Sequence, residues 1–307
     1  MSSIEFRVAK SIAPSDNSTS VVIPPTGSPQ FSLKGLDLAR YVDVPFAEHS
    51  HRSLLLDLLV PVGPGPKPLV VYVTGGGFVD ADKGNAQHLR TCLAESGFAV
   101  ASIQYRTVGE GAVYTDGIAD VQDAVAFLRA KAEDFGFDGA RVGLLGESAG
   151  GYLVTMAGLE HTPGVQAVVN KFGIVDFGTI AEDYDADMQA ALDGADYPLA
   201  LYLHGKGTGK TVHDLVPDAS PLNHITDEAP AFQIWHGTAD CIISPSQTLR
   251  LHNALREAGV DSTRYVLDGA DHGDVSALLG RPDEALPWYT EQVVGLTVDF
   301  FRKHLEN

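Results

Sequence analysis

The 307-residue chain is poor in cysteine and in basic residues, and it has no long apolar run. Its two cysteines, Cys92 and Cys241, exclude a disulfide-rich scaffold and a cysteine-rich zinc module. Lysine and arginine total 21 against 40 acidic residues, and this net charge of −19 disfavours a nucleic-acid partner. No run approaches the ~18 apolar residues of a membrane span. Because the first residues also lack the apolar core of a secretory signal, we expect a cytoplasmic protein; a homodimer stays open.

Short apolar runs alternate with helical patterns along most of the chain. The alternation predicts a mostly parallel sheet of about eight strands, covered by helices on both faces. The first two runs are joined by a short polar turn, which predicts an antiparallel hairpin at the leading edge. The expected strands are 40–46, 54–60, 69–73, 98–103, 142–145, 165–169, 231–235 and 263–267. The expected helices include 118–135, 251–258 and 293–300.

Two segments depart from this alternation. Residues 1–35 contain a stretch rich in serine and proline, which predicts an irregular N-terminal arm before a domain over 36–307. Residues 176–223 separate two expected strands and are too long for a plain connection. Because residues 172–205 carry seven acids and several aromatics but no lysine or arginine, we predict that 176–223 form an inserted cap with something to bury.

The strongest chemical signal is Ser148 within the pattern G-x-S-x-G. The pattern follows the apolar run 142–145 and opens a helix-compatible stretch. Small residues two places before and after the serine let strand and helix pass closely, so that the hydroxyl is exposed on a sharp turn. The context therefore predicts a nucleophile at the carboxyl edge of the sheet, and an ordinary glycine-rich turn is the weaker interpretation.

A second glycine-rich stretch, Thr74-Gly75-Gly76-Gly77-Phe78, follows the strand predicted over 69–73. Successive glycines allow backbone N–H groups to face a cavity without intervening side chains, an arrangement suited to a developing oxyanion. The spacing of a phosphate-binding loop is missing, and no cluster of histidine and carboxylate residues has the spacing of metal ligands. We therefore expect no metal site here.

Two further candidates follow the last two core strands. Asp240 comes after the strand predicted over 231–235, and His272 comes after 263–267 in a loop flanked by glycine. Asp271 and Asp274 are rival acids, but as close neighbours of His272 in sequence they are poorly placed to bond its ring. The other histidines, including His236, are expected at the surface or in supporting positions.

These segments together resemble the α/β-hydrolase superfamily, in which a triad follows the chain order serine, acid, histidine. The motifs VYVTGGGF, IQYR, LLGESAGG, IWHGTADCIISP and GADHG are similar to those of hormone-sensitive-lipase-like and carboxylesterase-like enzymes and of bacterial acetyl-xylan or feruloyl-type esterases. The resemblance implies Ser148, Asp240 and His272 as the catalytic triad. It implies an oxyanion hole built by the N–H groups of Gly76, Gly77 and Ala149, and a cap over the substrate pocket. Thr74 departs from the family, which usually has histidine there.

The predicted function is a cofactor-free serine carboxylic-ester hydrolase that acts on neutral, small to medium acyl or aryl esters. An amide hydrolase of the arylformamidase or acyl-peptidase type would use the same triad and stays open. A non-catalytic receptor is disfavoured because all three triad members are present. The side chains expected around the pocket are Phe78, Glu147, Tyr152, Phe177, Tyr184, Tyr197 and Tyr202.

Overall fold

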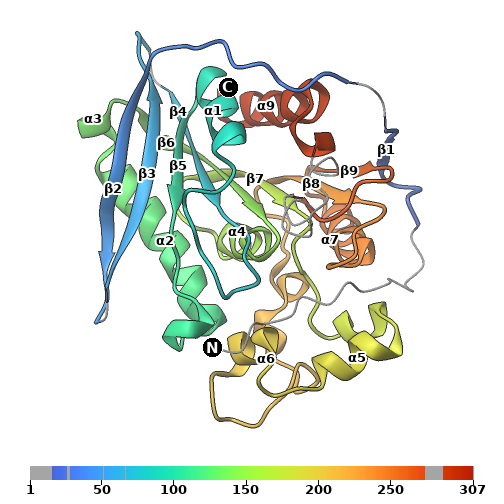
Figure 1. Ribbon diagram of the computed structural model, residues 1–307. Helices are drawn as coiled ribbons and strands as arrows, with labels where there is room; N and C mark the ends of the chain where they lie inside the picture. The colour runs from blue at the N-terminus through green and yellow to red at the C-terminus, as the bar shows by residue number, and fades with distance from the viewer. Residues whose placement is uncertain (1–15, 26–27, 51, 66, 274–285, 307) are drawn as a thin grey trace.

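The computed structural model describes residues 16–25, 28–50, 52–65, 67–273 and 286–306 (Figure 1). Within these residues the chain forms one sheet of nine strands in the order β1-β9-β8-β7-β6-β4-β5-β3-β2. The strands are β1 (Val21–Ile23), β2 (Leu38–Glu48), β3 (Ser53–Pro61), β4 (Pro68–Val73), β5 (Ala99–Ile103), β6 (Asp138–Glu147), β7 (Val165–Lys171), β8 (Ala231–Gly237) and β9 (Ser262–Leu267). All eight strands expected from the sequence are present.

Most of the sheet is parallel, as predicted. β4 pairs in parallel with β5 and β6, and parallel pairing continues through β7, β8, β9 and β1. β2 and β3 form the predicted antiparallel hairpin, and β3 also pairs antiparallel with β5. Every residue of β4 and β5 is buried, because helices cover both faces of these central strands.

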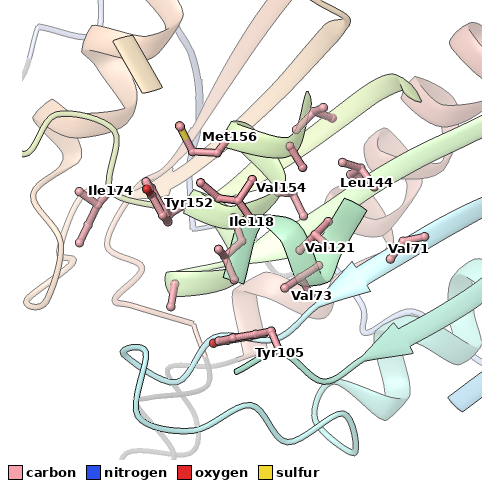
Figure 2. Packing of buried hydrophobic residues seen from close by; sticks show 14 of the residues in the cluster. Val71, Val73, Tyr105, Ile118, Val121, Leu144, Tyr152, Val154, Met156 and Ile174 are labelled. Carbon is pink, nitrogen blue, oxygen red and sulfur yellow. The ribbon is translucent and has the colours of Figure 1, made fainter. Parts of the chain in front are cut away.

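Two hydrophobic clusters lie on opposite faces of the sheet. One joins the sheet to α2 (Tyr114–Ala130), α4 (Ala149–Leu159) and α7 (Pro245–Glu257). The other joins it to α1 (Gln87–Glu95) and α9 (Glu291–Leu305). Figure 2 shows part of the first cluster, with Val73 of β4, Val121 of α2 and Val154 of α4 gathered in one layer.

The helix predicted over 118–135 is divided in two. α2 ends at Ala130, and a short helix, α3 (Ala132–Phe135), follows Lys131. The apolar stripe nevertheless remains on one side, because Ile118, Leu128 and Ala132 are all buried in the same cluster. A stripe of apolar residues therefore predicts which face is buried better than it predicts where a helix breaks.

The prediction of an irregular arm over 1–35 is wrong at residues 21–23, which form β1 and add a ninth strand. β1 pairs in parallel with β9, so that the edge of β9 is covered. The segment before it is held by Arg264 of β9, whose guanidinium donates to the Ser20 hydroxyl at 2.8 Å. Arg264 is 1% exposed, so these contacts satisfy a buried charged group.

The order of the strands determines where a site can form. β4 lies between β5 and β6, so the chain leaves β4 toward β5 on one side and leaves β6 toward β7 on the other. The loops that follow β4 and β6 therefore diverge, which leaves a crevice at the carboxyl ends of these two strands. Both glycine-rich motifs follow strands that end at this crevice.

The insertion between β7 and β8 contains short helices only. Within residues 176–223, which we call the cap, lie η2 (Ile180–Asp183), α5 (Ala186–Leu192), α6 (Pro198–His204), η3 (Pro217–Ala219) and η4 (Pro221–His224). Figure 1 shows α5 and α6 apart from the helices that cover the sheet, at the bottom of the view. Among the described residues, no helix is long and apolar enough to cross a membrane.

Candidate active site

Ser148 lies on a strained turn between β6 and α4. Its φ of 54° and ψ of −119° are unusual for a residue with a side chain. The turn depends on its flanking glycines. A Cβ at Gly150 would overlap the carbonyl oxygen of Val73, and one at Gly146 would overlap the carbonyl oxygen of Gly150. The two glycines therefore allow α4 to start directly against β4, and this close approach leaves the hydroxyl of Ser148 at the crevice.

The three residues of the predicted triad lie together. His272 Nε2 is 2.9 Å from Ser148 Oγ, and His272 Nδ1 is 2.7 Å from Asp240 Oδ2. Both ring nitrogens are thus taken, and the rival Asp271 instead accepts hydrogen bonds at Oδ1 from the backbone N–H groups of Cys241 and His272. Asp274 lies outside the described residues.

Asp240 is held as a buried carboxylate. Its Oδ1 accepts hydrogen bonds from the backbone N–H groups of Ile242 at 2.9 Å and Ile243 at 2.8 Å. Burial alone would raise the pKa of Asp240, but interactions with the imidazoles of His272 and His236 outweigh it and hold this pKa well below the usual carboxyl range. Asp240 is therefore an acceptor at neutral pH, so the shared proton resides on Nδ1 of His272.

His236 is a supporting residue whose role the sequence did not reveal. It is fully buried on β8, with Nε2 at 3.1 Å from Asp240 Oδ2 and 2.9 Å from the carbonyl oxygen of Ile243. Burial lowers the pKa of His236, so the ring is neutral. Since both neighbours of Nε2 are acceptors, Nε2 carries the proton and Nδ1 accepts from the Thr248 hydroxyl at 2.8 Å. The sequence places His236 among the histidines at the surface or in supporting positions, and nothing in it indicates a contact with Asp240.

Glu147 was expected at the pocket but points into the protein core. Its carboxylate lies 2.6 Å from Lys171 Nζ and accepts a hydrogen bond from the Tyr72 hydroxyl at 2.9 Å. Lys171 also fixes the nucleophile turn, because its carbonyl oxygen accepts a hydrogen bond from the Ser148 N–H at 2.9 Å. This buried ion pair explains why an acid can precede the serine without facing the substrate.

The glycine loop after β4 lies tightly against the nucleophile turn. A Cβ at Gly75 would come within 3.2 Å of Ser148 Cβ, and one at Gly76 would overlap the carbonyl oxygen of Asp80, since the loop curls back on itself. Thr74, which replaces the histidine of the resembling family, accepts a hydrogen bond from the Asn85 side chain at 3.1 Å. The loop is thus fixed by contacts of its own.

A cavity of about 80 Å³ opens beside Ser148 between the crevice and the cap. Of the seven side chains expected around the pocket, Phe78, Tyr184 and Tyr197 line it. The remaining lining residues are Gly77, Ser148, Ala149, Ile174, Ile180, Met188, Leu192, Pro198, Leu199, Ile242 and Ile243. No charged side chain is among these residues, so the cavity is apolar in spite of the acidic composition of the cap.

Tyr152, Phe177 and Tyr202 do not line the cavity, contrary to expectation. They pack behind Phe78 instead: the Tyr202 ring stacks on Phe78 with centroids 3.9 Å apart, and Tyr152 packs edge-on against Phe177 at 5.3 Å. Large rings bury more area in a cluster than in a narrow cavity. The wall is mainly aliphatic, and aliphatic residues give no signal in the sequence that distinguishes a pocket from a core.

Groups of three or more histidine, cysteine or carboxylate side chains that could hold a metal ion are absent from the described part of the chain. The polar groups at the crevice are instead paired with one another, as described above for Ser148, His272 and Asp240.

A family model described as BD-FAE matches residues 56–255. The chain belongs to this family. The match runs from β3 to α7 and includes the glycine loop, the nucleophile turn, the cap and Asp240. His272 follows the matched region, so its part in the site rests on the distances given above.

Named relatives of this BD-FAE chain include esterases. Over 217 residues it is 29% identical to "Esterase LipC" of Mycobacterium tuberculosis, and this match covers 68% of this chain and 53% of that protein. It is 28% identical over 240 residues to "Probable isoprenylcysteine alpha-carbonyl methylesterase ICMEL1" of Oryza sativa, over 72% of this chain and 54% of that protein. The chain spans about half the length of the curated relatives it matches.

Solved structures share the fold. A "Truncated form of carbohydrate esterase from gut microbiota" superposes with a TM-score of 0.71 at 22% sequence identity. The superposition covers 92% of this chain and 99% of that chain. The "Bacterial Heroin Esterase" has a TM-score of 0.68 at 22% identity, over 90% of this chain and 87% of its own. The predicted α/β-hydrolase fold is confirmed for this BD-FAE family member.

Proposed function

We propose that the protein is a serine carboxylic-ester hydrolase with Ser148 as nucleophile, His272 as general base and acid, and Asp240 as the acid that orients His272. The observation that carries the proposal is the continuous pair of short contacts from Ser148 Oγ to His272 and from His272 to Asp240. The names of the relatives support the reaction class.

In the first half of the reaction, Ser148 Oγ attacks the ester carbonyl carbon and its proton passes to His272 Nε2. The C–O bond to the alcohol then breaks, and His272 returns the proton to the leaving oxygen. In the second half, water loses a proton to His272 and attacks the acyl-enzyme, which releases the acid and restores Ser148. Asp240 stabilises the imidazolium form in both halves, because it is an ionised carboxylate against Nδ1.

The negative charge that develops on the carbonyl oxygen needs donors beside Ser148. We assign this role to the backbone N–H groups of Gly76, Gly77 and Ala149. Gly77 and Ala149 line the cavity with Ser148, and Ala149 is the first residue of α4, where N–H groups have no partner within the helix. Removal of one such donor typically costs ~10²–10³-fold in kcat.

The cavity favours neutral esters with a small acyl group. Its lining is uncharged, so a carboxylate placed inside would lose its hydration without a partner. Its volume of about 80 Å³ is well below the ~300–1,000 Å³ of sites for drug-sized ligands. Acetyl and other short acyl or aryl esters therefore fit this cavity best.

The decisive experiment is Ser148→Ala, assayed on p-nitrophenyl acetate. We expect kcat to fall by about 10³–10⁶-fold, because triad members act as one unit. The native protein should also label with a fluorophosphonate, and the variant should not. Thermal unfolding of the variant is the control for folding. Near-native turnover by the folded variant would refute the assignment, and faster turnover of a matched N-formyl anilide would favour an amide hydrolase.

A further inference from the structure

Tyr184 joins the substrate cavity to the loop that carries the triad acid. Its ring lines the cavity beside Ser148, and the residue as a whole is only 2% exposed. Its hydroxyl donates to the carbonyl oxygen of Ile242 at 2.6 Å and accepts from the N–H of Ser244 at 3.1 Å. One side chain of the cap therefore contacts both the space for substrate and the acid loop, residues 240–244.

The acid loop determines the position of the Asp240 carboxylate. Asp240 Oδ1 accepts from the N–H groups of Ile242 and Ile243, and the Ile242 carbonyl on the outer side of the same turn is the acceptor for Tyr184. His236 holds the loop from the core side, through the Ile243 carbonyl and Asp240 Oδ2. The loop that carries the carboxylate is thus held between a histidine of the sheet and a tyrosine of the cap.

We propose that Tyr184 is a positioning residue, whose hydroxyl keeps Asp240 aligned with His272 through the acid loop. The proposal rests on the proposed function, since it gives Asp240 its role in the triad. Burial raises the pKa of Tyr184 well above its usual value, so the hydroxyl stays protonated and remains a donor to Ile242. Loss of the hydroxyl removes this partner from the part-buried carbonyl of Ile242 and from the buried N–H of Ser244, and the loop can then rearrange.

The test is Tyr184→Phe, which removes the hydroxyl and keeps the ring that lines the cavity. With p-nitrophenyl acetate we expect kcat per folded molecule to fall by ~10-fold, because small misplacements of a triad member are costly. KM should stay within about 2-fold, because the cavity wall is unchanged. An unchanged kcat, or a fall in kcat/KM that comes only from a higher KM, would overturn the proposal.

Asp183→Asn is the control for general docking of the cap. Asp183 precedes Tyr184, is buried away from the cavity, and forms an ion pair with Arg250 of α7 at 2.9 Å. Breaking this pair should lower the unfolding temperature and leave kcat within about 2-fold, since the Asp183 carboxylate bonds to Gln247 and Arg250 of α7 and not to the Asp240 turn. If Asp183→Asn lowered kcat as much as Tyr184→Phe does, docking of the cap in general, and not the hydroxyl of Tyr184, would be the cause.

A double-mutant cycle tests whether Tyr184 acts through Asp240. In an Asp240→Asn background, the added Tyr184→Phe change should alter kcat by less than about 2-fold, because the group that it positions is already impaired. An undiminished ~10-fold loss in that background would refute the coupling. Ser148→Ala tests the proposed function separately, so failure of the cycle would leave the nucleophile assignment standing.

Discussion

The nucleophile turn and the cap are built in opposite ways, although they enclose the same cavity. At the turn, close backbone packing fixes the geometry: a Cβ at Gly150 would overlap the carbonyl oxygen of Val73, and one at Gly75 would crowd the turn itself. In the cap, helices of seven residues or fewer are held by side chains such as Asp183 and Tyr184. A turn fixed by backbone contacts tolerates almost no substitution, whereas a wall of side chains can be reshaped.

The difference suggests a division of roles. In the proposed mechanism, residues at the carboxyl ends of the strands carry the chemistry, which requires atoms to be placed within a fraction of an ångström. The cap supplies aliphatic contacts, which are additive and non-directional and can therefore determine acyl size without disturbing the triad. Tyr184 is the exception, because it belongs to the cap and bonds to the acid loop.

The largest effect on stability and turnover is expected at the nucleophile turn, from Gly150→Ala. A methyl group there would collide with the Val73 carbonyl, so α4 must move away from β4 and carry Ser148 with it. We expect a loss of about 1–3 kcal/mol in the free energy of unfolding and of ~10²-fold in kcat. Denaturant unfolding and ester hydrolysis measure the two effects.

Gly295→Ala in α9 is the matched control. A Cβ at Gly295 meets no atom within 4 Å, so the same change should stabilise the protein by up to about 1 kcal/mol through helix propensity, with kcat unchanged. If Gly150→Ala behaved like this control, the close contact of α4 with β4 would not be what fixes the nucleophile.

A smaller effect, on selectivity, is expected from Met188→Ala in the cap. Met188 is 7% exposed and lines the cavity, so its truncation enlarges the space for an acyl chain. We expect the ratio of kcat/KM for p-nitrophenyl hexanoate over acetate to rise ~10-fold, in line with 1–3 kcal/mol per methylene in an apolar pocket. Ala190→Ser, on the exposed side of the same helix, should leave the ratio unchanged. An unchanged ratio for Met188→Ala would place the acyl chain elsewhere.

The smallest effect is electrostatic. Glu182, Asp187, Asp193 and Asp196 are exposed on the cap, and their field should slow the entry of a carboxylate-bearing ester relative to a neutral ester of equal length. We expect a roughly 2–5-fold lower kcat/KM at low ionic strength, relieved by salt because exposed charges are screened beyond about 8–10 Å. Equal efficiencies at low salt would show that the charge of the cap does not influence entry.

Much of the site could be read from the sequence because its signals are local. Glycines around Ser148 are needed for one sharp turn, and Asp240 and His272 follow apolar strands whose ends must meet at one edge of a parallel sheet. The sheet itself was predictable for the same reason, since short apolar runs alternate with helical stripes. β1 could not be predicted in this way, because it forms by pairing with β9, which lies more than 200 residues away in sequence.

The tertiary structure alone decided the surroundings of this site. Glu147 precedes the nucleophile in sequence, yet it faces the core, because Lys171 on the neighbouring strand β7 offers a buried cation. His236 and Tyr184 support Asp240 only because β8 and the cap fold to opposite sides of one loop. Sequence determines which groups lie at the ends of strands through local periodicity. Which side chains share a cavity depends on packing between distant segments, and local patterns carry no information about that packing.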